Sequence, residues 1–247
     1  MARSRRLNGD GPPGRSEDGH VHPPVSPEQL YDARRQVFYA KPLWRGWMHL
    51  AFFELSLVCG TLLVVWARGS SEIIGAIVYA VTLGAMFGVS ALYHRGRWAE
   101  RSRVALQRLD HLMIFLMIAG TSTPIFLVAA PGPFGITCLI IVWSLTAMLS
   151  VTHLTWMNAP DRLVGGSYIG LGAVAAAGLP AIWIHAGTAA GILMIAGGVL
   201  YIVGAVSYYE RWPDVRPTTF GYHEFFHTYV SLAATCHFVA IALLITS

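Results

Sequence analysis

Seven apolar runs, each close to the length that a helix needs to cross a bilayer, follow one another along most of this chain. A membrane-spanning helix takes about 20 predominantly apolar residues. Within lipid, every backbone N–H and C=O group must be paired inside the segment, which favours helices. The runs cover residues 46–67, 72–93, 110–129, 134–153, 164–185, 187–208 and 222–246. The sequence therefore predicts an all-α, polytopic membrane protein built as a seven-transmembrane helix bundle.

Composition and spacing support this prediction. Hydrophobic residues make up 55% of the 247 positions and charged residues only 12%, against about 25% charged residues in soluble domains. The weakest separator is Ala186-Gly187-Thr188, between the fifth and sixth runs. Joining those two runs would reduce the count to six, but the combined stretch is too long for one crossing.

The distribution of positive charge predicts the orientation. Of the 17 lysines and arginines, only Arg68 falls in a loop that the seven-span topology places outside. Lysine and arginine concentrate in cytoplasmic loops of membrane proteins. We therefore expect a multi-pass protein of the plasma membrane with a cytoplasmic amino terminus and an external carboxyl terminus. The location of the basic residues therefore matters more than the net charge of +4, and no nucleic-acid partner is expected.

The chain divides into two parts. Residues 1–42 are rich in Arg, Pro and Gly and are predicted to form a basic cytoplasmic tail, disordered over 1–27. Residues 28–40 are predicted either to form a short helix on the membrane surface or to continue the unstructured tail. No apolar core follows the first arginines, so a signal peptide is not expected. Residues 43–247 form the predicted transmembrane domain. Its three cysteines lie in apolar runs and suggest neither a disulfide framework nor a cysteine zinc ribbon.

Titratable residues from three distant runs share one depth in this topology. His94 ends the second run, Asp110 opens the third, and His223 and His227 open the seventh. All four lie at the cytoplasmic end of their runs. Polar groups in a membrane are costly and mark functional sites, so this convergence predicts a site beneath the inner leaflet.

The local spacing fits a metal site. His223 and His227 are four residues apart and share one face of a helix, so both imidazoles can bind one Zn²⁺. His94 is the predicted third ligand, which leaves a fourth position for water, as in catalytic zinc sites. Ser90 lies one turn before His94, and Asp110 can accept a hydrogen bond from that water. Asp110 and Ser90 are therefore the predicted catalytic residues.

The remaining polar residues in the runs receive a structural interpretation. His49, His153 and His185 are predicted to be interfacial, with the ring tip reaching toward water. His237 lies too deep to share the site and is predicted to bond a neighbouring helix. Glu54 is an intramembrane carboxylate to which we assign no role.

Residues 223–227 also match the HExxH pattern of zinc proteases, in which the glutamate is the general base. An intramembrane protease of that kind needs a further acidic ligand, in an Asp-Gly context, on a later span. The seventh run is the last one here, and Asp110 precedes His111 rather than glycine. The pattern therefore favours a metal site over a protease.

A second set of motifs extends over most of the chain and resembles the hemolysin III family, the bacterial relatives of the progestin and adipoQ receptors. The resemblance runs from Lys41-Pro-Leu-Trp-Arg-Gly-Trp47 to the carboxyl terminus. Its motifs are Ser90-Ala-Leu-Tyr-His94, Leu109-Asp110-His111, Ala119-Gly-Thr-Ser-Thr-Pro124, Phe220-Gly-Tyr-His223-Glu-Phe-Phe-His227 and His237-Phe238. It implies a seven-helix bundle with zinc ligands at His94, His223 and His227, and with Asp110 contacting the metal through water. Some relatives have Gln at the position of Glu224, which favours Asp110 as the base.

Three functions follow from these features. The first is a zinc-dependent hydrolase acting on a lipid amide, with membrane lipids as partners. Resemblance to adiponectin receptors and alkaline ceramidases implies a ceramide-like or fatty acyl substrate. The second is a non-enzymatic sensor or receptor-like regulator of membrane lipid in which zinc is structural. The third is a pore-forming cytolysin, for which the sequence offers neither a secretion signal nor an amphipathic pore-forming segment. The oligomeric state stays open.

Overall fold

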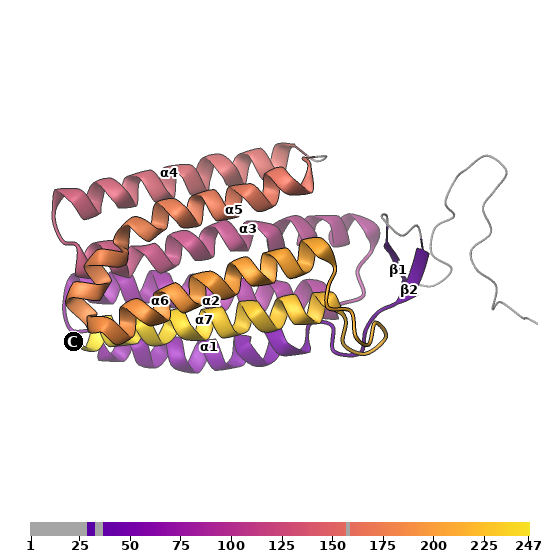
Figure 1. Cartoon of the computed structure of the whole chain (residues 1–247), viewed down its shortest axis with the longest axis horizontal. Coiled ribbons are helices and arrows are strands. Elements are labelled where there is room, and N and C mark those ends of the chain that lie inside the picture. The colour runs from indigo at the N-terminus through magenta and orange to yellow at the C-terminus, as the bar shows by residue number, and fades with distance from the viewer. Residues whose placement is uncertain (1–28, 33–36, 157–158) are drawn as a thin grey trace, which may run out of the picture.

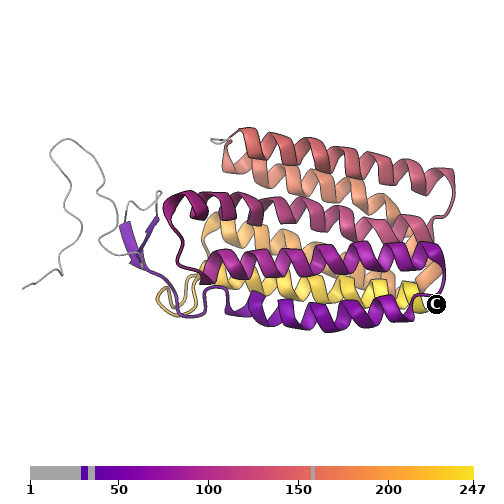
Figure 2. The same ribbon diagram turned by 180° about the vertical axis from the view of Figure 1, so that it is seen from behind.

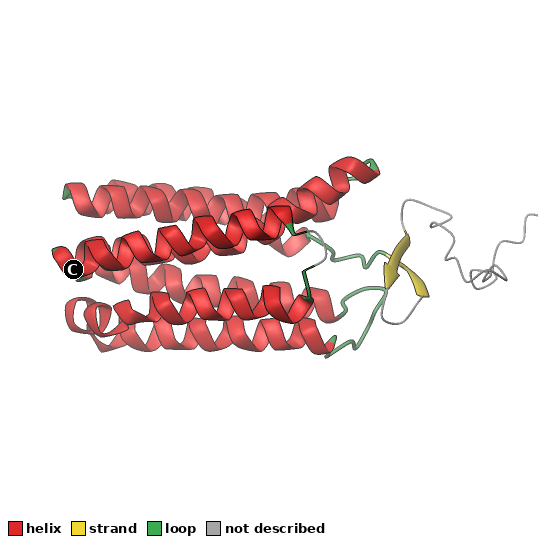
Figure 3. Ribbon diagram, turned by 90° about the horizontal axis from the view of Figure 1, so that it is seen from above, coloured by secondary structure: helices red, strands yellow, loops and turns green. Residues whose placement is uncertain are grey.

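The computed structural model describes residues 29–32, 37–156 and 159–247. Long helices lie side by side, and a pair of short strands lies beyond one end of the bundle (Figures 1 and 3). The strands are β1 (Gln29–Asp32) and β2 (Val37–Ala40). The long helices are α1 (Trp47–Trp66), α2 (Ser70–Arg95), α3 (Glu100–Pro124), α4 (Pro133–Thr155), α5 (Asp161–Ala175), α6 (Leu179–Glu210) and α7 (Tyr222–Thr246). Two short helical turns complete the chain, η1 (Ile125–Ala129) after α3 and η2 (Ala176–Gly178) after α5.

Six stretches of the described chain are long and apolar enough to cross a membrane. Five of them correspond to single predicted runs. The remaining one, Arg162–Glu210, has 49 residues; as one straight helix it would be about 73 Å long, over twice the hydrocarbon thickness of about 30 Å. It is interrupted by η2 and by Gly187, whose φ of 84° is non-helical. Figures 1 and 2 show α5 and the long part of α6 running in opposite directions. The predicted helical bundle is therefore confirmed, and the fifth and sixth runs form the interrupted stretch.

The outer surface of the bundle is strongly apolar. Many large aliphatic side chains are exposed, among them Val58 and Val65 on α1 and Ile140 and Val151 on α4. Helix α7, by contrast, contacts α1, α2, α3 and α6. Large exposed apolar areas are unusual on soluble monomers and mark surfaces covered by lipid or protein. The position of α7 places its first turn at the centre of one end of the bundle.

The amino-terminal segment differs from the prediction. Residues 29–32 and 37–40 form an antiparallel pair in which Gln29 faces Ala40 and Asp32 faces Val37. Neither alternative predicted for the segment 28–40, the short helix or the unstructured tail, is present in the described residues of that segment. Its second half contains Val, Phe and Tyr in succession, which favour strands over helices. The rest of the predicted tail, 1–28 and 33–36, lies outside the described residues.

Gly46 determines how closely α1 begins to the end of α2. Its φ of 79° lies in the left-handed region, which glycine adopts without steric cost. A Cβ atom at this position would lie 2.8 Å from the Cβ of His94 and 2.9 Å from the Cγ of Arg95. Only glycine permits this approach, so the start of α1 packs directly against the histidine at the end of α2.

Candidate metal centre

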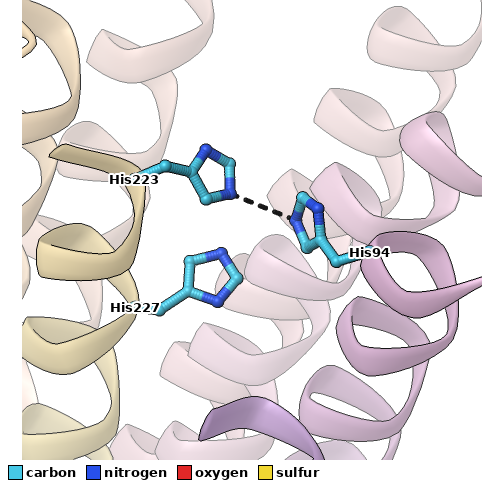
Figure 4. A group of neighbouring side chains, drawn as sticks. All are labelled: His94, His223 and His227. Carbon is cyan, nitrogen blue, oxygen red and sulfur yellow. Dashed lines mark hydrogen bonds between the residues drawn. The ribbon is translucent and has the colours of Figure 1, made fainter. Parts of the chain in front are cut away.

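Three histidines from α2 and α7 meet inside the bundle. His94 comes from the last turn of α2, and His223 and His227 come from the first two turns of α7 (Figure 4). One ring nitrogen from each lies within 4.8 Å of the other two. All three histidines lie in a buried group, and His223 is the least buried of the three residues. The predicted convergence of these residues is therefore present in the structure.

The spacing of the ring nitrogens suits a metal ion. The Nε2 atoms of His94 and His223 are 3.2 Å apart. Two nitrogens bound at 2.0–2.1 Å to one tetrahedral zinc ion lie about 3.3 Å apart. The His227 ring centroid is 5.0 Å from that of His94 and 4.6 Å from that of His223. Small side-chain rotations bring the third nitrogen to coordination distance, so the three histidines can hold a metal ion.

Asp110 lies beside this cluster, on the first half of α3. Its Oδ2 atom is 3.7 Å from the Nε2 atom of His94, and the Ser90 side chain lies beside the same carboxylate. His111, the next residue, is directed elsewhere: its ring centroid is 5.4 Å from that of His153, and its carbonyl accepts a hydrogen bond from the Tyr168 hydroxyl at 3.2 Å. Of Asp110 and its neighbour His111, Asp110 is the residue that the structure places against His94.

The carboxylate of Glu224 is engaged at both oxygens. Oε1 accepts a hydrogen bond from the Nε of Arg45 at 2.5 Å, and Oε2 accepts one from the Gly221 amide at 2.8 Å. The second bond satisfies an amide at the start of α7, as a glutamate three residues into a helix commonly does. Glu224 therefore stabilises the turn that carries His223 and His227, although its position in HExxH suggests a base.

His49 belongs to the site, and the prediction that it is interfacial is wrong. Its side chain is 3% exposed, and its ring stacks on that of His227 with centroids 3.8 Å apart and planes inclined by 24°. Neither ring nitrogen makes a hydrogen bond to any residue in the described part of the chain. One sequence signal could have located it. The buried positions of α1 are His49, Ser56, Gly60 and Leu63, so the histidine shares a helical face with the small and polar residues of an otherwise bulky run.

The other singled-out residues lie away from the cluster. His237 reaches α6, where its Nε2 is 3.1 Å from the Met194 carbonyl oxygen, which confirms that it bonds a neighbouring helix. His185 is exposed, with its Nδ1 3.1 Å from the Ala181 carbonyl oxygen. Glu54 lies on the exposed side of α1.

A match to a protein-family model includes all the residues of this site. A family model described as Haemolysin-III related matches residues 38–238. The chain is 28% identical to Hemolysin-3 of Bacillus cereus over 145 residues, which are 58% of this chain and 66% of that relative, just under two thirds of its length. It is 27% identical to the Hemolysin-3 homolog of Bacillus subtilis (strain 168) over 179 residues, 71% of this chain and 81% of that relative. The resemblance indicated by the sequence motifs is thereby confirmed, and the chain belongs to the haemolysin-III related family.

Proposed function

We propose that this protein binds zinc through His94, His223 and His227 and hydrolyses an amide bond in a membrane lipid, with ceramide-like amides as the substrate class. The observation that carries the proposal is the approach of three ring nitrogens within 4.8 Å, with the Asp110 carboxylate 3.7 Å from one of them. Imidazole nitrogens are common zinc ligands, and three of them leave one position open for chemistry. A zinc ion held in this way supplies an activated water molecule for hydrolysis.

The residues beside the histidines have separate roles in this proposal. Asp110 accepts the proton that is released when water attacks the amide carbonyl and passes it to the leaving amine. Ser90 lies beside Asp110, and its role in this proposal is to donate a hydrogen bond that orients the carboxylate toward the histidines. General acid–base catalysis of this kind requires a carboxylate within hydrogen-bond reach of the reacting atoms.

Two observations separate Asp110 from Glu224 as the proton acceptor. Asp110 is the carboxylate next to His94, and Glu224 is held by Arg45 and by the start of α7. A proton transferred to Glu224 would weaken a buried ion pair, whereas Asp110 has no such partner in the contacts described above. Asp110 is therefore the acid–base residue in this proposal.

His49 acts through His227. Stacked rings 3.8 Å apart restrict the rotation of the His227 side chain, so His49 keeps its nitrogen directed toward His94 and His223. Ordering a ligand before the metal binds lowers the entropy cost of binding. His49 is a positioning residue here, not a ligand.

The membrane topology that we propose has seven crossings with the amino terminus in the cytoplasm. Strand β2 and the carboxyl terminus lie at opposite ends of the bundle (Figure 1), which is what an odd number of crossings requires. Among the described basic residues, Arg68 lies in the loop between α1 and α2, at the end of the bundle away from the histidines. The other described lysines and arginines, such as Lys41, Arg45 and Arg211, lie toward the end that carries the histidines. The positive-inside rule then places the candidate site on the cytoplasmic side of the plasma membrane.

The test combines metal content with turnover. Purified protein is analysed for bound metals and then assayed for release of free fatty acid from ceramide. We expect about one zinc per chain and fatty acid release that is lost in His227→Ala. Equal release by wild type and His227→Ala would exclude the hydrolase.

A structural role for zinc is the second candidate function. The cluster joins α2 to α7, and a metal there would stabilise the contact between two helices distant in sequence. In that case the protein is a non-enzymatic lipid sensor or regulator, and zinc removal lowers the unfolding temperature of a protein that hydrolyses nothing.

The names of the Bacillus relatives raise cytolysis as a third function. The exposed faces of the bundle are apolar, as suits a protein that stays in its own membrane. Leakage of dye from liposomes that hold the purified protein tests this function; the absence of leakage at high protein loading excludes a pore.

A further inference from the structure

A groove runs along the outer face of α1 and α2, separate from the histidine cluster. Its volume is about 910 Å³, and its lining extends from Val65 and Ile77 at one end to Arg95 and Gly96 at the other. Aliphatic and small residues form nearly all of this lining, and Arg95 is the one charged residue among them. The groove is therefore a hydrophobic surface that ends at a cation.

The length and direction of the groove suit a hydrocarbon chain. From Ile77 to Arg95 the groove follows α2 over about 27 Å, close to the bilayer hydrocarbon thickness of about 30 Å. Close packing of α1 on α2 keeps the groove narrow: a Cβ at Gly60 would lie 2.8 Å from the Cβ of Ala80, and one at Gly88 would lie 2.9 Å from the ring of Phe53. The small residues of the lining thus let α1 and α2 pack closely, and bulkier residues such as Val65 and Ile77 complete the groove.

The cytoplasmic end of the groove is positively charged. The Arg95 guanidinium lies 3.5 Å from the centroid of the Trp47 ring, an aromatic contact that holds the side chain without neutralising its charge. Burial, with the positive charges of Arg45, Arg95 and Arg97, lowers the pKa of Lys41, so these cations lie close together. Arg45 is paired with Glu224, whereas the exposed Arg95 side chain lies at the end of the groove.

We propose that this groove binds one anionic phospholipid of the cytoplasmic leaflet, with an acyl chain along α1 and α2 and the phosphate at Arg95. Arginine binds phosphate through charge-assisted hydrogen bonds, and positive residues at the membrane surface attract anionic lipids. A lipid in this position holds α1 against α2. Because His49 lies on α1 and His94 directly precedes Arg95, the lipid stabilises the helix contact on which the histidine cluster rests.

The experiment measures lipid retention by the purified full-length chain. Native mass spectrometry from detergent compares phosphatidylglycerol with phosphatidylcholine of identical acyl chains. We expect one phosphatidylglycerol to be retained per chain in preference to phosphatidylcholine. Arg95→Gln is expected to reduce that preference about tenfold, the effect of losing one charge-assisted contact, and Arg95→Lys is expected to keep most of it.

Matched variants separate the groove from the general membrane surface. Val81 lines the groove and is 64% exposed, whereas Val58 is 61% exposed and lies outside the lining. Val81→Trp fills the groove and should abolish retention, while Val58→Trp should not. Arg101→Gln, which removes an exposed charge near the same end of the bundle, should leave the preference unchanged.

Three results would overturn the proposal. One is equal retention of the two phospholipids, and another is unchanged retention in Val81→Trp. The third is a wild-type dimer that Val81→Trp converts to a monomer, which would assign the groove to a second copy of the chain. None of these results depends on whether zinc binds or ceramide is hydrolysed.

Discussion

Arg45 and Glu224 form a buried ion pair although they are 179 positions apart in the sequence. The Arg45 Nε lies 2.5 Å from Glu224 Oε1, and the two side chains are only 7% and 2% exposed. The pair joins the segment that precedes α1 to the first turn of α7. The ion pair therefore holds α1 close to α7, and these are the helices that carry His49 and His227.

Removing one partner of this pair should be strongly destabilising. Arg45→Ala leaves the Glu224 carboxylate buried without its counter-charge, which typically costs about 3–5 kcal/mol. Replacing both residues, as in Arg45→Met with Glu224→Gln, removes the unpaired charge and should restore much of the loss. Thermal unfolding in detergent measures both variants. Equal unfolding temperatures for Arg45→Ala and the double variant would show that the charge on Glu224 is not the cause.

Loss of one candidate ligand should abolish stoichiometric zinc binding. His223→Ala and His94→Ala each leave two imidazoles, too few for the proposed three-histidine site. Metal analysis of the purified variants should find well below one zinc per chain. His153→Ala, which removes a histidine that contacts His111 instead of the cluster, is the matched control and should retain the wild-type metal content.

Substitution of the two carboxylates should separate their roles. Asp110→Asn keeps the size of the side chain but removes its basicity, so we expect ceramide hydrolysis to fall by about 10²–10⁴-fold with zinc retained. Glu224→Gln keeps an oxygen for the Gly221 amide and should lose far less activity, although it should unfold at a lower temperature. The reverse order of activities would assign the base to Glu224, as in the HExxH pattern of zinc proteases.

The stacking of His49 on His227 should contribute to metal affinity. His49→Ala removes the ring and is expected to weaken zinc binding by about 0.5–1.5 kcal/mol, the usual contribution of an aromatic pair. His49→Phe retains a ring for stacking and should bind zinc nearly as well as wild type. Competition with a fluorescent chelator measures both affinities. A Phe variant as weak as the Ala variant would show that the nitrogens of His49 matter, not its stacked ring.

The topology can be checked by labelling introduced cysteines in a background without the native ones. Ser71→Cys, in the first turn of α2, and Ser247→Cys, at the end of α7, should react with a membrane-impermeant maleimide from outside intact cells. Asp214→Cys, between α6 and α7, should react only after the membrane is opened. Accessibility of position 214 and position 247 from the same side would contradict the crossing assigned to α7.

The apolar runs and the main ligand positions could be predicted because a bilayer penalises every unpaired polar group. That penalty limits the spanning segments to helices, and it makes His94, Asp110, His223 and His227 conspicuous at the ends of their runs. Because four residues complete about one helical turn, the closeness of His223 and His227 could be predicted without knowledge of the other helices. These four polar residues and their common depth were thus visible in the chain itself.

Only the tertiary structure decided which groups touch. In lipid the outer face of a helix is as apolar as its packed face. The small and polar residues on one face of α1 therefore hint that His49 points inward, but nothing in the sequence shows that it stacks on His227. The partner of Glu224 was equally hidden, because Arg45 lies at the other end of the chain and meets it only when α1 packs beside α7. The strands at 29–32 and 37–40 depend on pairing between two segments, whereas the break at Gly187 was predictable from the separator Ala186-Gly187-Thr188. Local patterns determined the helices and their polar ends, whereas contacts between distant helices determined which carboxylate faces the histidines.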